Sequence, residues 1–132
     1  MEYYFRGRCR TGKDGRYEFY CLRPTPYPIP DDGPGGRLLD LLDRHHTRPG
    51  HIHFIIKAAK YQPVVTQIFD RMDKCLASDS VFAVEDSLIV DFAPREGDQK
   101  PDFELQYDFR LAAFEDAKKY PVVGITEESA SY

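Results

Sequence analysis

The chain has 132 residues, a formal net charge of −4 and a pI of about 5.5. This length is typical of a single domain and is sufficient to bury a hydrophobic core without disulfide bonds. Lysine and arginine form no run longer than two residues, so we expect no nucleic-acid partner. No apolar run approaches the ~20 residues of a membrane span, so we expect no membrane association.

The cysteines and the N-terminal residues indicate the cellular compartment of the protein. Cys9, Cys21 and Cys75 are an odd number and lack the spacing of a metal site. We expect reduced thiols that pack as small hydrophobic residues in a cytoplasmic protein. The first residues, MEYYFRGRCR, are charged from position 2 onward, which is not the pattern of a secretion signal.

The first third of the chain predicts a β-hairpin, a long loop and a short helix. Residues 4–10 and 16–22 have the composition of strands, and TGKDG at 11–15 is a strong turn sequence between them. Residues 23–36 contain five prolines and three glycines, a density that predicts no strand ladder. The leucine-rich segment RLLDLLDR predicts an amphipathic helix over residues 37–44.

Four further strands are predicted, over residues 51–57, 64–69, 87–92 and 103–111. The last of these, FELQYDFRL, alternates apolar and polar residues most regularly, which indicates a half-buried strand. Short strands with turn-rich connections and one short helix predict an all-β fold, an antiparallel β-sandwich. We expect one domain over residues 1–132.

Two histidines, His51 and His53, begin the predicted strand 51–57. Side chains at positions i and i+2 of a strand point to the same face, so the two imidazoles point together. Such a pair can present two nitrogen ligands to one metal ion. It is equally compatible with two histidines that are hydrogen-bonded in a polar cleft.

Tyr27 is enclosed by Pro26 and Pro28 in the proline-rich loop. Each proline restricts the backbone at its own position and at the residue before it, which holds the aromatic ring in one pose. One interpretation is a tyrosine that packs as a plug of the loop. The other is a tyrosinate ligand of a ferric ion, which favours anionic oxygen donors with imidazoles and deprotonates the phenol on binding.

Two segments carry a family resemblance: LRPTPYPIPDDGPGGRLLDLLDRHHTRPGHIHF, residues 22–54, and VVTQIFDRMDKCLASDSVFAVEDSLIVDF, residues 64–92. They resemble the catalytic domain of the intradiol ring-cleaving dioxygenases, in particular the hydroxyquinol 1,2-dioxygenase branch. The resemblance runs from about Tyr4 to Leu111. An enclosed tyrosine, an Arg-Pro, a His-x-His and a Thr-Gln occur in the family's order.

The resemblance implies the β-sandwich of the intradiol dioxygenases, with one short helix, and a non-haem Fe(III) cofactor. It implies that Tyr27, His51 and His53 are metal ligands, and that Tyr27 leaves the iron when substrate binds. Arg48 would be the catalytic cation that stabilises negative charge on the attacked carbon. Gln67 would be the catalytic amide that hydrogen-bonds substrate or intermediate. The expected partners are a small aromatic substrate and O2.

The chain departs from the family at its N-terminus. The family's first tyrosinate ligand lies upstream of the matched segments and has no counterpart among them. We therefore expect an N-terminally truncated catalytic domain whose retention of Fe(III) is open. Tyr3 or Tyr4 could replace the missing ligand, or a partner chain could supply it. An unpaired strand edge would favour a homodimer.

The leading hypothesis for function is an enzyme that cleaves a catechol- or hydroxyquinol-type ring with O2 at a non-haem iron site. One alternative is a relative without iron that performs isomerisation, hydrolysis or cyclisation on an aromatic or polyketide-like ligand. The other alternative is a ligand-binding protein without catalytic activity.

Overall fold

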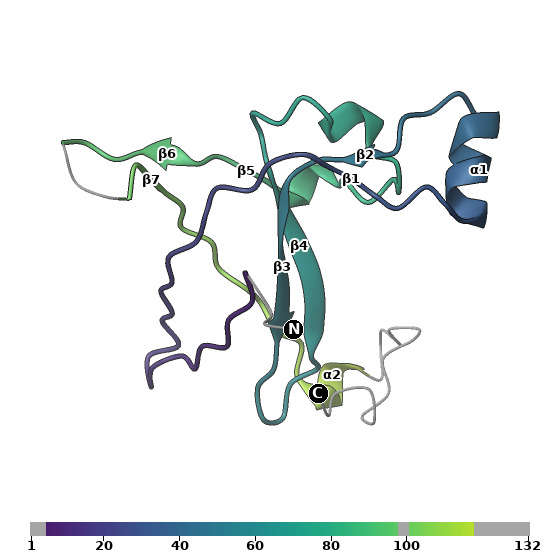
Figure 1. The fold of residues 1–132 in the computed structure, drawn as a ribbon. Coiled ribbons are helices and arrows are strands. Elements are labelled where there is room, and N and C mark those ends of the chain that lie inside the picture. The colour runs from purple at the N-terminus through teal and green to yellow at the C-terminus, as the bar shows by residue number, and fades with distance from the viewer. Residues whose placement is uncertain (1–4, 98–100, 118–132) are drawn as a thin grey trace.

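The computed structural model describes residues 5–97 and 101–117 (Figure 1). Within this part of the chain, no helix is long and apolar enough to cross a membrane. Short strands form small open sheets, with one helix longer than a single turn. In chain order the elements are β1 (Tyr27–Pro28), α1 (Pro34–Leu41), β2 (Thr47–Arg48), β3 (His51–Ile56), β4 (Val64–Asp70), the 3-10 helices η1 (Leu76–Ser78) and η2 (Asp86–Leu88), β5 (Ile89–Val90), β6 (Ala93–Pro94), β7 (Phe103–Glu104) and α2 (Phe114–Ala117).

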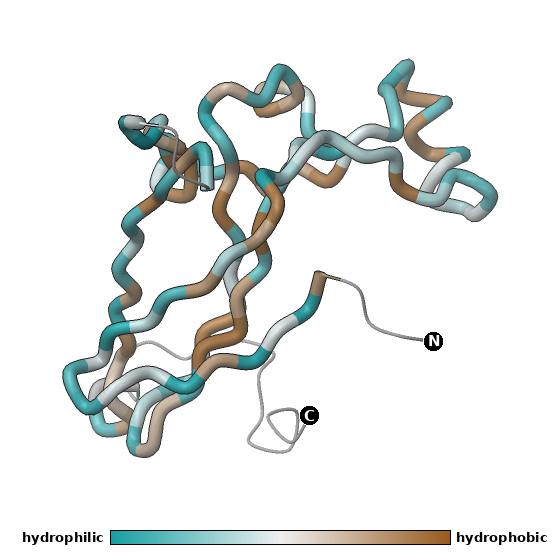
Figure 2. The backbone as a smooth tube through the Cα atoms, turned by 60° about the vertical axis from the view of Figure 1, so that its left-hand side comes forward, coloured by the Kyte–Doolittle hydropathy of each residue, from teal (hydrophilic) through white to brown (hydrophobic). Residues whose placement is uncertain are grey.

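The central sheet has the strand order β3-β4-β5. β3 and β4 pair antiparallel, from His51 opposite Phe69 to Ile56 opposite Val64. β5 lies parallel to the end of β4, so the predicted antiparallel arrangement is wrong for this pair. The hydrophobic residues of the chain are concentrated along these central strands (Figure 2).

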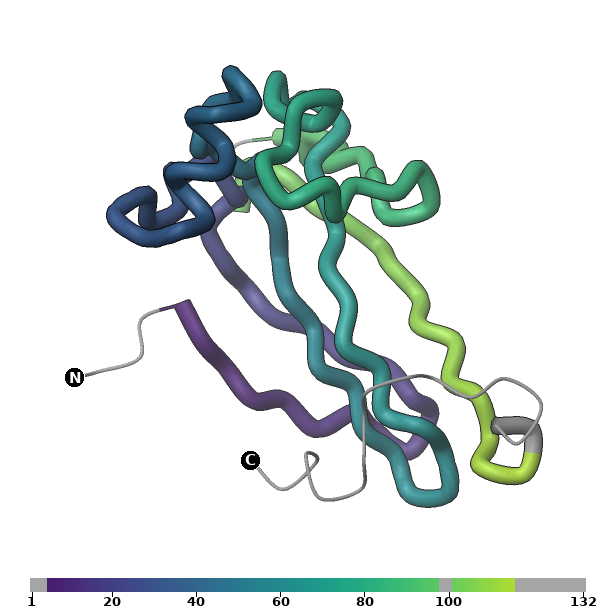
Figure 3. Tube along the Cα trace, turned by 90° about the vertical axis from the view of Figure 1, so that its right-hand side faces the viewer, coloured from purple at the N-terminus to yellow at the C-terminus, as the bar shows by residue number. Residues whose placement is uncertain are grey.

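Aromatic side chains cover one face of the central sheet. The ring centroid of Phe54 on β3 lies 4.8 Å from that of Phe109 and 6.1 Å from that of Phe19. The hydroxyl of Tyr17 donates to the backbone oxygen of Tyr107 at 2.6 Å. The extended segments 16–22 and 103–111 therefore run along the central strands and are joined to each other (Figure 3). His51 and His53 lie on the opposite face of β3.

The predicted hairpin over 4–10 and 16–22 is wrong as a strand pair in the described part of the chain. From residue 6 to residue 22 the chain passes around a turn that Gly12 closes by donating to the oxygen of Arg16 at 3.0 Å, but no ladder forms. Of the predicted strand 103–111, only the first two residues, Phe103–Glu104 in β7, pair with another strand. Alternation of residue types identifies the buried side of an extended segment, and it does not specify a hydrogen-bonding partner.

The other predicted elements are present with altered bounds. The strands predicted over 51–57 and 64–69 are β3 and β4, whereas only Ile89–Val90 of the segment 87–92 joins a sheet. The predicted helix is α1, and it begins earlier than expected because Pro34 suits the first helical turn. Gly36 of α1 is buried directly against the backbone of Asp31, where no side chain would fit.

One small ladder occurs where the proline-rich loop was predicted to have none. Tyr27 pairs with Arg48 and Pro28 with Thr47, so β1 lies antiparallel to β2. The backbone N–H of Ile29 adds a hydrogen bond to the oxygen of His46 at 2.8 Å. Pro28 is tolerated because β1 is an edge strand of a two-stranded sheet. This ladder brings the loop that carries Tyr27 to the start of β3.

Candidate metal centre

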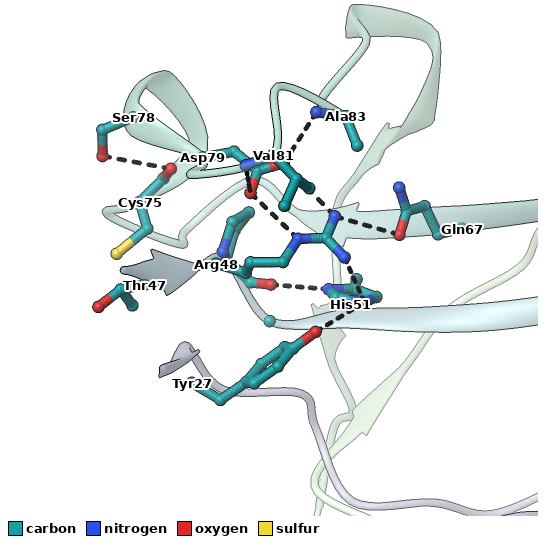
Figure 4. A network of polar contacts seen from close by, with 12 residues as sticks. Tyr27, Thr47, Arg48, His51, Gln67, Cys75, Ser78, Asp79, Val81 and Ala83 are labelled. Atoms are coloured by element: carbon teal, nitrogen blue, oxygen red, sulfur yellow. Dashed lines mark hydrogen bonds and ion pairs between the residues drawn. The ribbon is translucent and has the colours of Figure 1, made fainter. Parts of the chain in front are cut away.

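Two strand pairings and one short connection bring the predicted site residues together (Figure 4). The β1–β2 ladder sets Tyr27 opposite Arg48. β3 begins three residues after Arg48, with His51, and the β3–β4 register sets Gln67 opposite His53. Residues from β1, β2, β3 and β4 therefore face one region.

The three predicted ligands lie side by side. The hydroxyl of Tyr27 is 3.5 Å from Nε2 of His51, and the centroids of these two rings are 5.5 Å apart. The ring centroids of His51 and His53 are 4.7 Å apart, as expected for neighbours on one strand face. Tyr27 is 40% exposed, so its ring has room to move.

The hydrogen bond of Nδ1 determines which ring nitrogen of His51 carries the proton. Nδ1 of His51 is 2.8 Å from the backbone oxygen of Pro49. A carbonyl oxygen only accepts hydrogen bonds, so Nδ1 carries the proton and donates. Nε2 is then the unprotonated nitrogen, and its lone pair faces the Tyr27 hydroxyl and Nη1 of Arg48. This is the tautomer that metal binding through Nε2 requires.

The pKa values of both histidines are lowered, which favours their neutral form. Burial lowers the pKa of His51, and the positive charge of Arg48 lowers it further, against the opposing effect of the Pro49 carbonyl. His53 is more exposed, but partial burial, the neighbouring His51 and Arg48 all lower its pKa as well. Neutral imidazoles bind metal ions without first releasing a proton.

Arg48 is a buried cation in a fixed position, with 8% of its surface exposed. Its Nη2 donates to Oε1 of Gln67 at 3.4 Å, and its Nη1 lies 3.4 Å from Nε2 of His51. On the far side, its Nε donates to Oδ1 of Asp79 at 3.1 Å. The guanidinium therefore faces the candidate ligands with one edge and is anchored by a carboxylate at the other.

Asp79 is a residue that the sequence analysis missed. It is 3% exposed, and it accepts hydrogen bonds from the backbone nitrogens of Val81 and Ala83 in addition to Arg48. Burial raises the pKa of Asp79, but these hydrogen bonds and the charge of Arg48 outweigh it, so the net pKa is lowered. Asp79 is thus a carboxylate that compensates the buried charge. No sequence pattern links it to Arg48.

The chemistry of the candidate donor atoms decides whether they suit the iron that the family resemblance implies. Within residues 5–97 and 101–117, no three histidine, cysteine, aspartate or glutamate side chains gather as a metal site. The candidate centre instead combines the phenol oxygen of Tyr27 with two neutral imidazoles. Imidazole nitrogens with an anionic oxygen suit iron, so the residues present fit this metal. Tyr3 and Tyr4, the proposed substitute ligands, lie outside the described residues.

The described residues thus bring two imidazoles, a phenol oxygen and a buried arginine to one region. The profile of a family described as "Dioxygenase" matches residues 1–113, and the chain belongs to this dioxygenase family. The family resemblance inferred from the sequence is thereby confirmed.

Named relatives agree with this assignment. The intradiol ring-cleavage dioxygenase prcA of Aspergillus niger is 46% identical over 107 residues, covering 81% of this chain and 34% of the relative. The 6-chlorohydroxyquinol 1,2-dioxygenase of Cupriavidus pinatubonensis is 48% identical over 106 residues, covering 80% of this chain and 37% of the relative. The crystal structure of 3-chlorocatechol 1,2-dioxygenase from Rhodococcus opacus 1CP superposes with a TM-score of 0.72 at 35% identity, covering 79% of this chain and 41% of that chain. The chain spans about a third of the length of the curated relatives that it matches.

Proposed function

We propose that the chain is part of an enzyme that cleaves a catechol- or hydroxyquinol-type ring with O2, at Fe(III) bound by Tyr27, His51 and His53. The observation that carries this proposal is the geometry around His51. Its protonated Nδ1 donates to the backbone oxygen of Pro49, and its unprotonated Nε2 lies 3.5 Å from the Tyr27 hydroxyl, beside the ring of His53. The names of the relatives, which are intradiol, catechol and hydroxyquinol dioxygenases, support the reaction class.

Ferric iron, when bound, would supply a Lewis acid for the two hydroxyl oxygens of the substrate and a redox partner for its reaction with dioxygen. Tyr27 is the ligand suited to leave, because it is partly exposed and lies on the two-residue strand β1, within the proline-rich segment. Its Oη would then take up a proton that the incoming diol releases. His51 and His53 come from a strand paired on one side, and they are suited to stay in place.

Arg48 and Gln67 would act on the substrate ring. The guanidinium of Arg48 is a fixed positive charge, and its stabilisation of negative charge on a reacting carbon needs no reorganisation during the reaction. Oε1 of Gln67 already accepts from Arg48, so the amide N–H groups of Gln67 are the part left to donate to a substrate oxygen. Arg48 thereby also fixes which end of the Gln67 amide faces the reacting centre.

The finer fold and the assembly are proposals as well. The aromatic layer over Phe54 supports the β-sandwich of the intradiol dioxygenases, with the extended segments 16–22 and 103–111 as the start of its second layer. In the part of the chain that the structure describes, β3 has β4 on one edge and no strand on the other. A free strand edge supports the proposed homodimer.

Oxygen uptake with candidate substrates tests the proposed activity. We expect the iron-loaded chain to consume dioxygen and catechol or hydroxyquinol in equal amounts and to form a ring-opened diacid. His51→Ala and His53→Ala should abolish this activity, whereas His45→Ala, at a histidine that contacts Ser78 instead, should retain it. Turnover of an aromatic ligand without oxygen uptake would favour the non-oxidative alternative. Ligand binding without turnover would favour the binding protein.

A further inference from the structure

We propose that Asp73 is a positioning residue for His51, acting through the peptide group between Pro49 and Gly50. The backbone nitrogen of Gly50 donates to Oδ2 of Asp73 at 2.7 Å. The carbonyl oxygen of Pro49 accepts from Nδ1 of His51 at 2.8 Å. The functional meaning of this inference rests on the proposed metal centre, whereas the hydrogen-bond chain itself does not.

The two hydrogen bonds belong to one rigid unit. The carbonyl of Pro49 and the N–H of Gly50 are the two ends of a single planar peptide group, and in a trans peptide they point in opposite directions. A carboxylate that accepts from the N–H end therefore fixes the direction of the carbonyl at the other end. That carbonyl in turn fixes the plane and the tautomer of the His51 ring.

Charge as well as direction passes along this chain. A hydrogen bond to an ionised carboxylate is shorter and stronger than one between neutral groups. Hydrogen bonds in series polarise one another, so Asp73 makes the Pro49 oxygen a better acceptor for the His51 proton. Retention of the proton on Nδ1 leaves Nε2 as the metal-binding atom. In a carboxylate–histidine–metal triad, the carboxylate accepts a hydrogen bond directly from the histidine. Here a peptide group lies between the carboxylate and the histidine.

The surroundings of the peptide group prevent it from turning by itself. The Pro49 side chain is less than 2% exposed. A Cβ atom placed on Gly50 would lie 2.6 Å from the backbone nitrogen of Thr25, so the proline-rich loop packs directly on this peptide. Asp73 approaches from the segment that follows β4. The peptide is therefore held between two segments that are distant in sequence.

A purely local role for Asp73 is the competing explanation. Its Oδ1 accepts from the backbone nitrogen of Cys75 at 2.8 Å, which is a turn contact two residues along the chain. Serine forms the same kind of local turn but has no charge and a shorter reach. Asp73→Ser therefore preserves the turn and removes the contact to Gly50. Asp73→Asn preserves the size of the side chain and removes its charge. Asp43→Asn, at an exposed position, is the matched control.

The experiment measures the ring nitrogens of His51 by NMR in the metal-free chain, and iron affinity by titration with iron alone. We expect wild type and Asp43→Asn to hold the Nδ1–H tautomer, and both Asp73 variants to lose part of it. Iron binding should weaken about 10- to 100-fold in both Asp73 variants, the range observed for residues that orient a metal ligand. Circular dichroism of each variant confirms that it is folded.

The outcomes separate this inference from the proposed function. Wild-type tautomer populations in Asp73→Ser and Asp73→Asn would overturn the inference, because Asp73 would then serve the turn alone. A shifted tautomer in both variants, in a chain that binds no iron even as wild type, would support the positioning role and contradict the iron site. Unchanged tautomers with tight iron binding in every variant would contradict the positioning role of Asp73 and support the iron site.

Discussion

Removal of the Asp79 carboxylate should destabilise the chain far more than removal of an exposed carboxylate. In the Arg48–Asp79 pair the side chains are 10% and 2% exposed, and Nε and Oδ1 are 3.1 Å apart. Asp79→Ala leaves the guanidinium charge buried without its partner, which costs about 3–5 kcal/mol of unfolding free energy. The same substitution removes the acceptor for the backbone nitrogens of Val81 and Ala83, so the upper part of this range is expected.

Urea unfolding at pH 7, followed by circular dichroism, measures this loss. The matched control is Asp91→Ala, which removes an ion pair to Arg71 that is shorter, at 2.8 Å, but whose side chains are 54% and 70% exposed. An exposed pair contributes about 0–1 kcal/mol, so the control should change stability little. A double variant, Arg48→Met with Asp79→Ala, should recover part of the loss because no buried charge remains. If Asp79→Ala costs no more than Asp91→Ala, the structure does not bury this charge as described.

Two further predictions concern acid stability and helix packing. The hydrogen bonds of Asp79 outweigh its burial and lower its pKa below 3.8, so its ionised form stabilises the fold above pH 3.8, and this contribution is lost as the pH falls through the lowered pKa. Asp79→Asn should therefore lose less stability than wild type on acidification below pH 3.8, and parallel acid titrations of the two proteins would contradict this. Gly36→Ala should cost about 1–3 kcal/mol because its Cβ would overlap the backbone oxygen of Asp31. Gly35→Ala, with open space around it, should be neutral or stabilising by up to about 1 kcal/mol, and equal thermal shifts for the two variants would refute the packing of α1.

The sequence was most informative where one local pattern determines one structural feature. The spacing of His51 and His53 places both imidazoles on the same face of any strand, and their rings are 4.7 Å apart in β3. The alternation of 103–111 likewise identified the residues that turn inward. A strand's pairing partner depends on segments elsewhere in the chain, so the predicted hairpin failed although its residues are extended.

The rest of the candidate site depends on contacts that no local pattern encodes. The ladder between Tyr27 and Arg48 occurs in a proline-rich loop that was predicted to have none. Asp73 and Asp79 lie in the segment after β4, more than twenty residues from the groups that they bind, Gly50 and Arg48. Each is one aspartate among many in a charged chain. Only the fold brings them to the segment that leads into β3.

The central claim is that Tyr27, His51 and His53 hold a ferric ion. Metal analysis of the purified chain, combined with its visible absorption spectrum, tests this most directly. We predict bound iron and a broad visible band from charge transfer between the Tyr27 phenolate and the iron. Tyr27→Phe should lose the band, and His51→Ala should lose the iron. A chain without iron, or one whose iron and colour are unchanged in Tyr27→Phe and His51→Ala, would contradict the account.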